Sequence, residues 1–412
     1  MSTSQEHSFP RAEPSRVAQA VALGIVLLTI SWALLHTGFW SGTQIVDTPV
    51  YERYGEAVLD GQVPYRDFEL EYPPAALPAF VLPALAEHDA YDSAFELLMW
   101  ACAVAAVVAL GLALAAVDAS PARLFAAISF FALAPLALGT VILSRYDLWP
   151  AALTIAALAA FVGRRERLGF GILGLAVAAK IYPLVLLPLA LVWAAKRRGT
   201  RDVWIGLACF AGVLAACFVP FLILAPGGVA HSIGTQLGRP LQIESLGASL
   251  LLAAQQLGIY DATVESSHGS QNLTGPLPDT LAALQTAFQL VAVGVVWAVF
   301  AARDRGREGL LTAGAASVAA FVAFGKVLSP QFLIWLLPLV PAVAGAGGLA
   351  ACGLLLVGLV TTQLWFPFRY WDVVALEPAG WLVLVRNVVL VALYGVLLAA
   401  FSRRGRGGAR TA

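Results

Sequence analysis

The sequence predicts an all-α, polytopic membrane protein with about twelve transmembrane crossings. Its mean hydropathy of +0.81 lies well above that of a soluble globular domain. Apolar runs long enough to span a bilayer also recur along the whole chain. The first of them, residues 17–35, follows Arg11 and Arg16 in the manner of a secretory signal, but it is too long and no small-residue cleavage site follows it. We therefore expect it to be retained as the first helix.

The apolar runs divide the chain into predicted crossings joined by polar connections. The crossings are residues 17–38, 93–117, 122–143, 147–163, 168–180, 182–195, 203–224, 280–301, 309–325, 331–344, 348–366 and 379–401. Most lysines and arginines lie in connections on one side of this arrangement, so the positive-inside rule places both termini in the cytoplasm. The resulting parts are a cytoplasmic tail (1–16), a single integral membrane domain (17–401) with outer loop one (39–92) and outer loop two (226–279), and a basic cytoplasmic tail (402–412).

Two of the predicted crossings are interrupted helices. The run from residue 168 to 199 has basic residues at both ends, which fits two half-length helices meeting near Lys180–Pro183. The same pattern recurs where Lys326 precedes Pro330. The only other lysine, Lys196, lies in a cytoplasmic basic cluster. Lysines at two membrane breaks indicate an anionic ligand approached from the outer leaflet, the alternative being that they snorkel to the interface or pair with nearby carboxylates.

The outer loops carry most of the remaining polar residues. In loop one, residues 48–60 predict a surface helix with Pro49 near its start and Gly61 as its stop, and residues 73–85 predict an apolar helix lying along the membrane. In loop two, residues 238–258 predict another interfacial helix before a polar stretch. The arginine-, alanine- and glycine-rich composition is typical of a prokaryotic protein, so we expect a plasma-membrane location with these loops outside.

Several motifs occur in order along the chain. Loop one reads D-x-x-x-Y, G-x-x-x-Y-x-D and E-Y-P-P, and the later stretches are SRYDLWPA, AAKIYPLVLLPLAL, RPLQIESL and GKVLSPQFLIWLLPL. Together they resemble the polyprenol-phosphate-mannose-dependent mannosyltransferases of actinobacteria, in the glycosyltransferase-C superfamily. The resemblance covers most of the chain and implies a glycosyltransferase-C-like fold whose extracytoplasmic first loop carries juxtamembrane helices.

The resemblance also implies a reaction. The enzyme would transfer a sugar, mannose by this likeness, with inversion from a polyprenyl-phosphate donor to a cell-envelope glycolipid or polysaccharide. Inversion needs a general base on the acceptor hydroxyl and a stabilised phosphate leaving group. Asp47 matches the loop-one aspartate of the family and would be the base, whereas the residues alone allow it equally to be the N-cap of the helix after it. His36, near the outer end of the first helix, is a rival base.

The basic residues outside the cytoplasmic clusters are candidates for the donor phosphate. Lys180, Lys326 and Arg239 supply charge, Gln331 and Ser329 supply neutral donors, and Arg145 and Arg369 are in reserve. Asp147 and Glu244 are expected to orient arginines through the pairs Arg145–Asp147 and Arg239–Glu244. Further candidates for substrate contact are the aromatic residues Tyr51, Tyr65, Tyr72 and Trp371 and the loop-one carboxylates Asp67 and Glu71. The aromatic residues can also be ordinary interfacial residues.

Other function classes fit the sequence less well. We expect no metal, cofactor, nucleotide-sugar site or nucleic-acid partner, because no D-x-D motif stands on a soluble domain and no outer basic stretch is interleaved with aromatics. The four cysteines lie inside apolar segments without metal-ligand spacing, which predicts buried thiols. A transporter or lipid flippase would also have many crossings and broken helices, but the carboxylate-rich first loop argues against it. A non-catalytic partner in cell-envelope assembly would have no need of a potential base beside cations.

Overall fold

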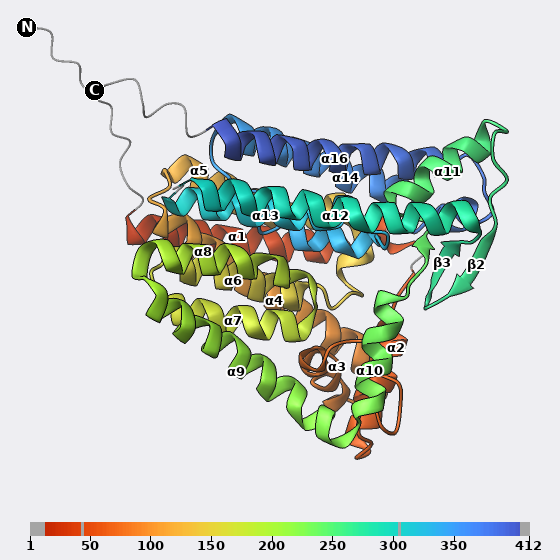
Figure 1. Ribbon diagram of the computed structural model, residues 1–412, viewed down its shortest axis with the longest axis horizontal. Coiled ribbons are helices and arrows are strands. Elements are labelled where there is room, and N and C mark those ends of the chain that lie inside the picture. The colour runs from red at the N-terminus through yellow and green to blue at the C-terminus, as the bar shows by residue number, and fades with distance from the viewer. Residues whose placement is uncertain (1–12, 43–44, 304–305, 404–412) are drawn as a thin grey trace, which may run out of the picture.

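The computed structural model describes residues 13–42, 45–303 and 306–403 and is built largely of helices (Figure 1). Among these residues, seven helices are long and apolar enough to cross a membrane. They are α1 (Pro14–Leu34), α4 (Tyr91–Ala116), α5 (Pro121–Leu138), α9 (Thr200–Leu224), α12 (Pro276–Ala302), α14 (Gly345–Trp365) and α16 (Gly380–Arg403). A multi-pass helical membrane protein is therefore confirmed, while the number of twelve crossings stays a prediction. The four cysteines are free.

The other five predicted crossings correspond to elements that do not meet this criterion. They are α6 (Leu148–Val162), α7 (Glu166–Ala179), the 3₁₀ helix η6 (Tyr182–Leu186) with α8 (Leu187–Arg198), α13 (Gly306–Ala323) and the 3₁₀ helix η7 (Pro330–Leu336). At 1.5 Å per residue, the 14 residues of α7 span only about 21 Å, less than the ~30 Å of a hydrocarbon core. Because α7 ends before it has crossed, the backbone that follows it must be covered by protein.

The two helix breaks lie where the sequence predicts them. Helix α7 ends at Ala179, and Lys180 has an extended backbone (φ −160°, ψ 141°) before the next helix starts. Helix α13 ends at Ala323, and η7 begins at Pro330. The carbonyls left open by the second break are satisfied by side chains of α12. Gln289 Nε2 donates to the Phe321 carbonyl (2.6 Å), and Gln285 Nε2 donates to the Gly325 carbonyl (2.5 Å).

Basic side chains close the helices at one end of the bundle, where α8 meets α9 (Figure 1). Lys196 Nζ donates to the carbonyls of Ala301 (2.6 Å) and Arg303 (3.1 Å), where α12 ends. Arg307 donates to the Ala116 carbonyl at the end of α4 (2.6 Å). Cations at helix C-termini satisfy open carbonyls and complement the helix dipole. The basic residues of the positive-inside pattern therefore also stabilise helix C-termini at this end. We call it the inner end, after the orientation that the pattern predicts.

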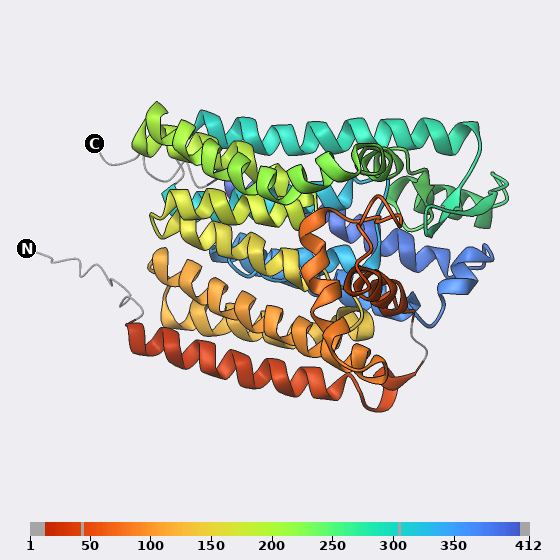
Figure 2. The ribbon, with the colours of Figure 1, turned by 90° about the horizontal axis from the view of Figure 1, so that it is seen from below.

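The opposite, outer end carries loop one. Its elements are η1 (Gly38–Ser41), α2 (Thr48–Leu59), η2 (Pro74–Ala76), α3 (Leu77–Val81), η3 (Pro83–Leu85) and η4 (His88–Ala90). The predicted surface helix is confirmed as α2. The predicted apolar helix 73–85 is present but broken, because Pro78 and Pro83 cannot donate backbone hydrogen bonds. In Figure 2, these segments lie at the end of the roughly parallel long helices.

Loop two covers the rest of the outer end. It contains α10 (Pro226–Leu237), β1 (Leu241–Gln242), α11 (Leu246–Gln256), β2 (Val264–Ser267) and β3 (Ser270–Leu273). The three strands form an antiparallel sheet in the order β1-β3-β2. The all-α prediction missed this sheet because the polar stretch from 264 to 273 has no alternating apolar pattern. A last short helix, α15 (Tyr370–Val374), lies between α14 and α16.

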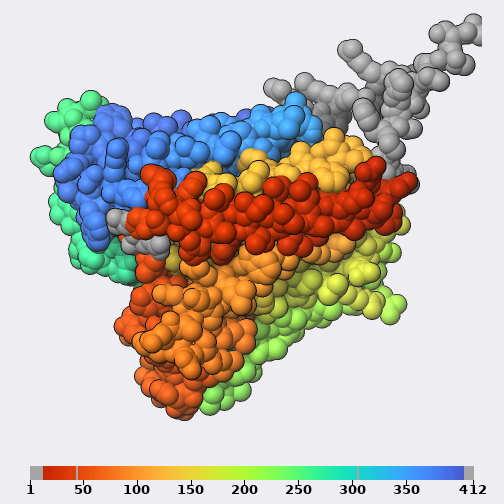
Figure 3. All heavy atoms as spheres, turned by 180° about the vertical axis from the view of Figure 1, so that it is seen from behind, coloured from red at the N-terminus to blue at the C-terminus, as the bar shows by residue number. Residues whose placement is uncertain are grey.

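The outside of the bundle is apolar, as contact with lipid requires. Figure 3 shows α1 lying on the surface along the length of the molecule. Large apolar side chains are exposed on it, including Val26 (54%) and Ile30 (51%). Helix α9 is even more exposed, with Trp204 at 69% and Ile223 at 74%. Exposed apolar bands of this length are expected only where lipid covers them.

The orientation of the two ends can be tested by cysteine labelling. In a background without the four native cysteines, single cysteines at Asp60 and Glu265 should react with an impermeant thiol reagent on intact cells, because both positions are exposed at the outer end. A cysteine at Arg164, in the connection between α6 and α7, should react only after the cells are opened. Labelling of Arg164→Cys from outside would reverse the orientation and move the candidate site to the cytoplasm.

Candidate active site

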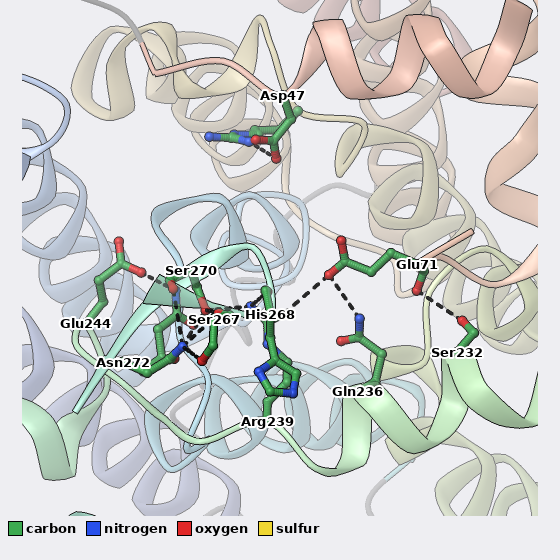
Figure 4. Close-up of polar contacts among 12 residues, drawn as sticks. Asp47, Glu71, Ser232, Gln236, Arg239, Glu244, Ser267, His268, Ser270 and Asn272 are labelled. Atoms are coloured by element: carbon green, nitrogen blue, oxygen red, sulfur yellow. Dashed lines mark hydrogen bonds and ion pairs between the residues drawn. The ribbon is translucent and has the colours of Figure 1, made fainter. Parts of the chain in front are cut away.

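Asp47 lies at the outer end, immediately before α2, and its carboxylate does not cap that helix. Its backbone occupies the N-cap position, yet the side chain makes no capping hydrogen bond. The carboxylate instead forms an ion pair with Arg145 (Figure 4) and accepts a hydrogen bond from the Tyr51 hydroxyl (3.3 Å). Both contacts reach Oδ2, and among the described residues no hydrogen bond or ion pair reaches Oδ1. With 32% of the side chain exposed, Asp47 therefore keeps one oxygen available.

Arg145 fixes the position of Asp47. Its side chain is only 7% exposed, and Nη2 donates to the Ile45 carbonyl (3.1 Å), which holds the chain just before Asp47. The Arg145–Asp147 pair expected from sequence is wrong. Arg145 and Asp147 lie in the turn before α6, and there Arg145 points to Asp47 while Asp147 points into the bundle.

Asp147 and Lys180 form a buried pair between the two helix breaks. The Asp147 side chain is fully buried, and its Oδ1 accepts from Lys180 Nζ (2.6 Å) and from Trp335 Nε1 of η7 (2.5 Å). The ammonium also lies over the rings of Tyr146 (4.6 Å) and Trp335 (5.2 Å). Of the two alternatives for Lys180, pairing with a nearby carboxylate is the arrangement in the structure. A lysine neutralised in this way is less suited to hold a phosphate.

A second group of charges links loop one, α10 and the second helix break. Arg239 Nη1 lies 3.8 Å from Glu71 Oε1, and its Nη2 donates to Ser270 Oγ (3.0 Å) and the His268 carbonyl (3.2 Å) (Figure 4). The Arg239–Glu244 pair expected from sequence is therefore also wrong. Arg239 Nε is buried and has no hydrogen-bond partner in the described residues.

Lys326 lies near Arg239 but has no counter-ion. Its Nζ donates to the Leu237 carbonyl at the end of α10 (2.9 Å), and no carboxylate of a described residue lies within ion-pair distance of it. The positive charge of Arg239 repels the positive charge of Lys326. Two neighbouring cations, of which one is unpaired and the other only loosely paired, repel each other, and an anion between them would relieve that repulsion.

Glu244, after β1, is buried among arginines from three elements. Its carboxylate accepts from the Gln242 side chain, while its backbone carbonyl accepts from Arg386 Nη2 (2.7 Å) and Asn387 Nδ2 (3.1 Å). Burial raises the pKa of Glu244 to about 7, and the charges of Arg386, Arg145 and Arg239 oppose that shift. The charges of Arg145, the partner of Asp47, and of Arg239, the neighbour of Lys326, therefore both favour the ionised form of Glu244.

Arg386 is the residue that the sequence reading missed. It stands alone in the apolar run 379–401, and a single charge within a membrane span is itself a signal of function. Its side chain is fully buried and lies over the Trp365 ring (5.5 Å), but Nε and Nη1 have no hydrogen-bond partner in the described residues. Each buried polar group without a partner costs about 1–3 kcal/mol, so such a position requires an explanation.

The loop-one tyrosines form a packed aromatic cluster. Tyr51 is fully buried, stacks on Phe80 (4.6 Å between ring centroids) and meets Tyr72 and Tyr146 edge to face. Burial raises the pKa of Tyr51 well above its ordinary value, so the hydroxyl remains a proton donor to Asp47. Tyr65 donates its hydroxyl to the Tyr72 carbonyl (2.6 Å). These side chains hold α2 and Asp47 in place.

The remaining predicted residues lie apart from this group or have local partners. Asp67 closes a turn through Arg66 (2.8 Å) and the Val63 N–H (2.7 Å), and these contacts lower the pKa of Asp67 to about 2. Gln331 has a buried Oε1 without a described partner, and Ser329 precedes η7 without a side-chain capping bond. Of three other predicted residues, Arg369 and Trp371 are exposed, and His36 pairs with Glu96 (3.2 Å).

One group of described side chains has the composition of a metal site. Glu52 and Glu56 of α2 and His88 of η4 place their ligand atoms within 4.8 Å of one another. His88 Nδ1 lies 2.8 Å from Glu52 and 3.2 Å from Glu56, and these carboxylates raise the pKa of His88. Ion pairing explains the contacts without a metal. The expectation of metal-independent chemistry stays a prediction.

A family model matches the chain. The model of Glycosyltransferase family 87 matches residues 70–330, and none of the curated proteins compared with the chain matches it. The matched stretch contains Arg145, Lys180, Arg239, Glu244 and Lys326, whereas Asp47 and Arg386 lie outside it.

Proposed function

Because the chain belongs to glycosyltransferase family 87, we propose that it transfers a mannosyl group from a polyprenyl-phosphate donor to an acceptor hydroxyl at its outer end. The acceptor would be a cell-envelope glycolipid or polysaccharide, and the site would face outward from the plasma membrane of a prokaryote. The observation that carries this proposal is the Asp47 carboxylate, which makes no capping bond and keeps Oδ1 available. It lies at the end of the bundle that also holds the unpaired Lys326.

The reaction would be a single displacement with inversion. The acceptor oxygen attacks the anomeric carbon from the side opposite the phosphate, and Asp47 Oδ1 takes the proton of the attacking hydroxyl. As the new C–O bond forms, the bond to the phosphate oxygen breaks, and the leaving phosphate keeps the electron pair. Arg145 orients Asp47 through its ion pair with Oδ2, and Tyr51 donates to the same oxygen.

Arg239 and Lys326 are the preferred partners of the leaving phosphate. Lys180 and Arg145 each have a close carboxylate, Asp147 and Asp47 respectively, so their charge is already compensated. Arg239 is 3.8 Å from Glu71, and the partner of Lys326 in the described part of the chain is a carbonyl. Negative charge grows on the phosphate as the glycosidic bond breaks, and the loosely compensated cations stabilise it most. Gln331, next to Pro330, would supply a neutral contact.

The assignment of these cations is tested by replacing Lys326 with methionine. We expect kcat/KM for polyprenyl-phosphate mannose to fall by about 30- to 1000-fold, equal to about 2–4 kcal/mol, because a charged partner is lost in a poorly solvated site. Inhibition by added polyprenyl phosphate should weaken in parallel. Lys326→Arg should recover only part of the loss, since the guanidinium fork has a different shape.

Lys196→Met is the matched control, because this lysine binds only carbonyls at the inner end. It should leave the use of the donor unchanged. A folded Lys326→Met protein that uses the donor and binds polyprenyl phosphate like the wild type would show that Lys326 is not a phosphate ligand.

A further inference from the structure

A set of buried polar side chains meets at the outer end of α16. Arg386 and Asn387, consecutive residues of this helix, both donate to the carbonyl of Glu244 (2.7 and 3.1 Å). Asn387 also donates to Ser249 Oγ of α11 (3.0 Å), and Gln242 donates to the Glu244 carboxylate. All four side chains, those of Gln242, Glu244, Arg386 and Asn387, are at most 4% exposed. We call them the α16 cluster.

The α16 cluster holds polar atoms of both kinds without partners. Among the described residues, Arg386 Nε and Nη1 are donors without a hydrogen-bond acceptor, and the guanidinium has only the Trp365 ring over it (5.5 Å). Gln242 Oε1 and Asn387 Oδ1 are acceptors with no donor. A phosphate offers only acceptor oxygens and would face two amide oxygens and the carboxylate. A sugar hydroxyl donates and accepts at once, so a set of mixed donors and acceptors matches hydroxyl groups.

The position of the α16 cluster fits a sugar between the two reacting groups. The charges of Arg145, which pairs with Asp47, and of Arg239, the neighbour of Lys326, both act to lower the pKa of Glu244. During transfer, the sugar ring carries the anomeric carbon, with the leaving phosphate on one side of this carbon and the attacking acceptor oxygen on the other. Figure 4 shows Asp47 on one segment of the chain and Arg239 and Glu244 on another, the connection between α10 and α11. Helix α16 lies outside the stretch that the family model matches.

We propose that the α16 cluster is a subsite that hydrogen-bonds the hydroxyl groups of a hexose ring and so sets the sugar specificity of the enzyme. Its members are Arg386, Asn387, Gln242 and Glu244. This inference rests on the proposed glycosyl transfer. The ring belongs either to the lipid-linked donor or to the acceptor, and hydroxyl recognition is common to both. A site whose buried groups are built to pair with a hydroxyl strongly rejects an analogue that lacks it, because those groups are then left unpaired.

The test measures kcat/KM of the purified full-length protein with monodeoxy substrates. One arm uses polyprenyl-phosphate mannose and its 2-, 3-, 4- and 6-deoxy forms, and the other uses octyl α-mannoside and its deoxy forms as acceptors. In the wild type, we expect loss of one particular hydroxyl to lower kcat/KM by about 100-fold or more. In Arg386→Gln and Arg386→Lys, loss of the same hydroxyl should cost less than about threefold, since that penalty comes from leaving Arg386 unpaired. The arm that shows this coupling identifies the ring.

The matched control is Arg123→Gln at the inner end. Arg123 is also largely buried and donates to a carbonyl, that of Ala342, but it lies at the start of α5. It should keep the wild-type ranking of deoxy substrates. The proposal is overturned if every deoxy substrate equals its parent in the wild type, an outcome that needs no variant to fold, or if the Arg386 variants keep the wild-type discrimination. Absence of any transfer from polyprenyl-phosphate mannose by the wild type would instead contradict the proposed function on which the subsite depends.

Discussion

Replacement of Asp47 by asparagine is expected to lower the rate of sugar transfer by about 10²- to 10⁴-fold, the usual contribution of a general base. Asparagine keeps the shape of the side chain, and its amide oxygen can still accept from Arg145 and Tyr51, but it has no usable basicity. Asparagine is also as good an N-cap as aspartate, so α2 should form normally. The variant should therefore fold and bind the lipid donor while transfer is lost.

The matched control is Asp60→Asn at the other end of α2. Asp60 is exposed and lies in the same helix–turn segment, so a general effect of removing a loop-one carboxylate would appear there too. We expect this variant to keep wild-type transfer. An Asp47→Asn protein that is well folded and transfers at a near-normal rate would place the base elsewhere, and His36 would be the next residue to replace.

Replacement of Lys180 by methionine is expected to destabilise the protein by about 3–5 kcal/mol, the usual cost of removing one partner of a buried ion pair. The reason is that the Asp147 carboxylate, which is fully buried, would lose its only cation within ion-pair distance among the described residues. Thermal unfolding of the detergent-solubilised protein should therefore begin at a clearly lower temperature. Replacing both members, as Lys180→Met with Asp147→Leu, should restore much of the stability, since an apolar pair carries no desolvation cost.

This experiment separates the two membrane lysines, which have the same pattern in the sequence. Lys326→Met should impair donor use with little change in stability, because no carboxylate of a described residue pairs with Lys326 and would be left without its cation. If Lys180→Met instead unfolds like the wild type and fails only in donor use, Lys180 rather than the Arg239–Lys326 pair holds the phosphate.

The parts of the fold that depend on hydropathy and local backbone rules could be predicted from the sequence. The first retained helix, the helix starting at Thr48–Pro49 and the breaks at Lys180 and Pro330 follow from apolar run length, charge and proline. Such signals are carried by neighbouring residues and need no knowledge of packing. The same holds for the concentration of polar groups in loop one.

The partners of the charged residues could not be predicted, because they depend on which helices pack together. Arg145 and Asp147 are neighbours in sequence, yet one joins loop one and the other joins the two helix breaks. The sheet of loop two pairs β1 with β3 across more than thirty residues, and its short polar strands have no periodic signature. Arg386 does have a signal in the sequence, as the one charge in the apolar run 379–401, but its partners, which lie on loop two, do not.

The central claim, that the protein transfers a sugar from a lipid phosphate at its outer end, is tested most directly by donor choice. The purified protein in liposomes would receive radiolabelled polyprenyl-phosphate mannose or GDP-mannose, with octyl α-mannoside as acceptor. The account predicts labelled product only from the lipid donor, with one polyprenyl phosphate released per sugar transferred and the anomeric configuration inverted. Product from GDP-mannose with the lipid donor left unused, or product that retains the configuration of the lipid donor, would contradict it.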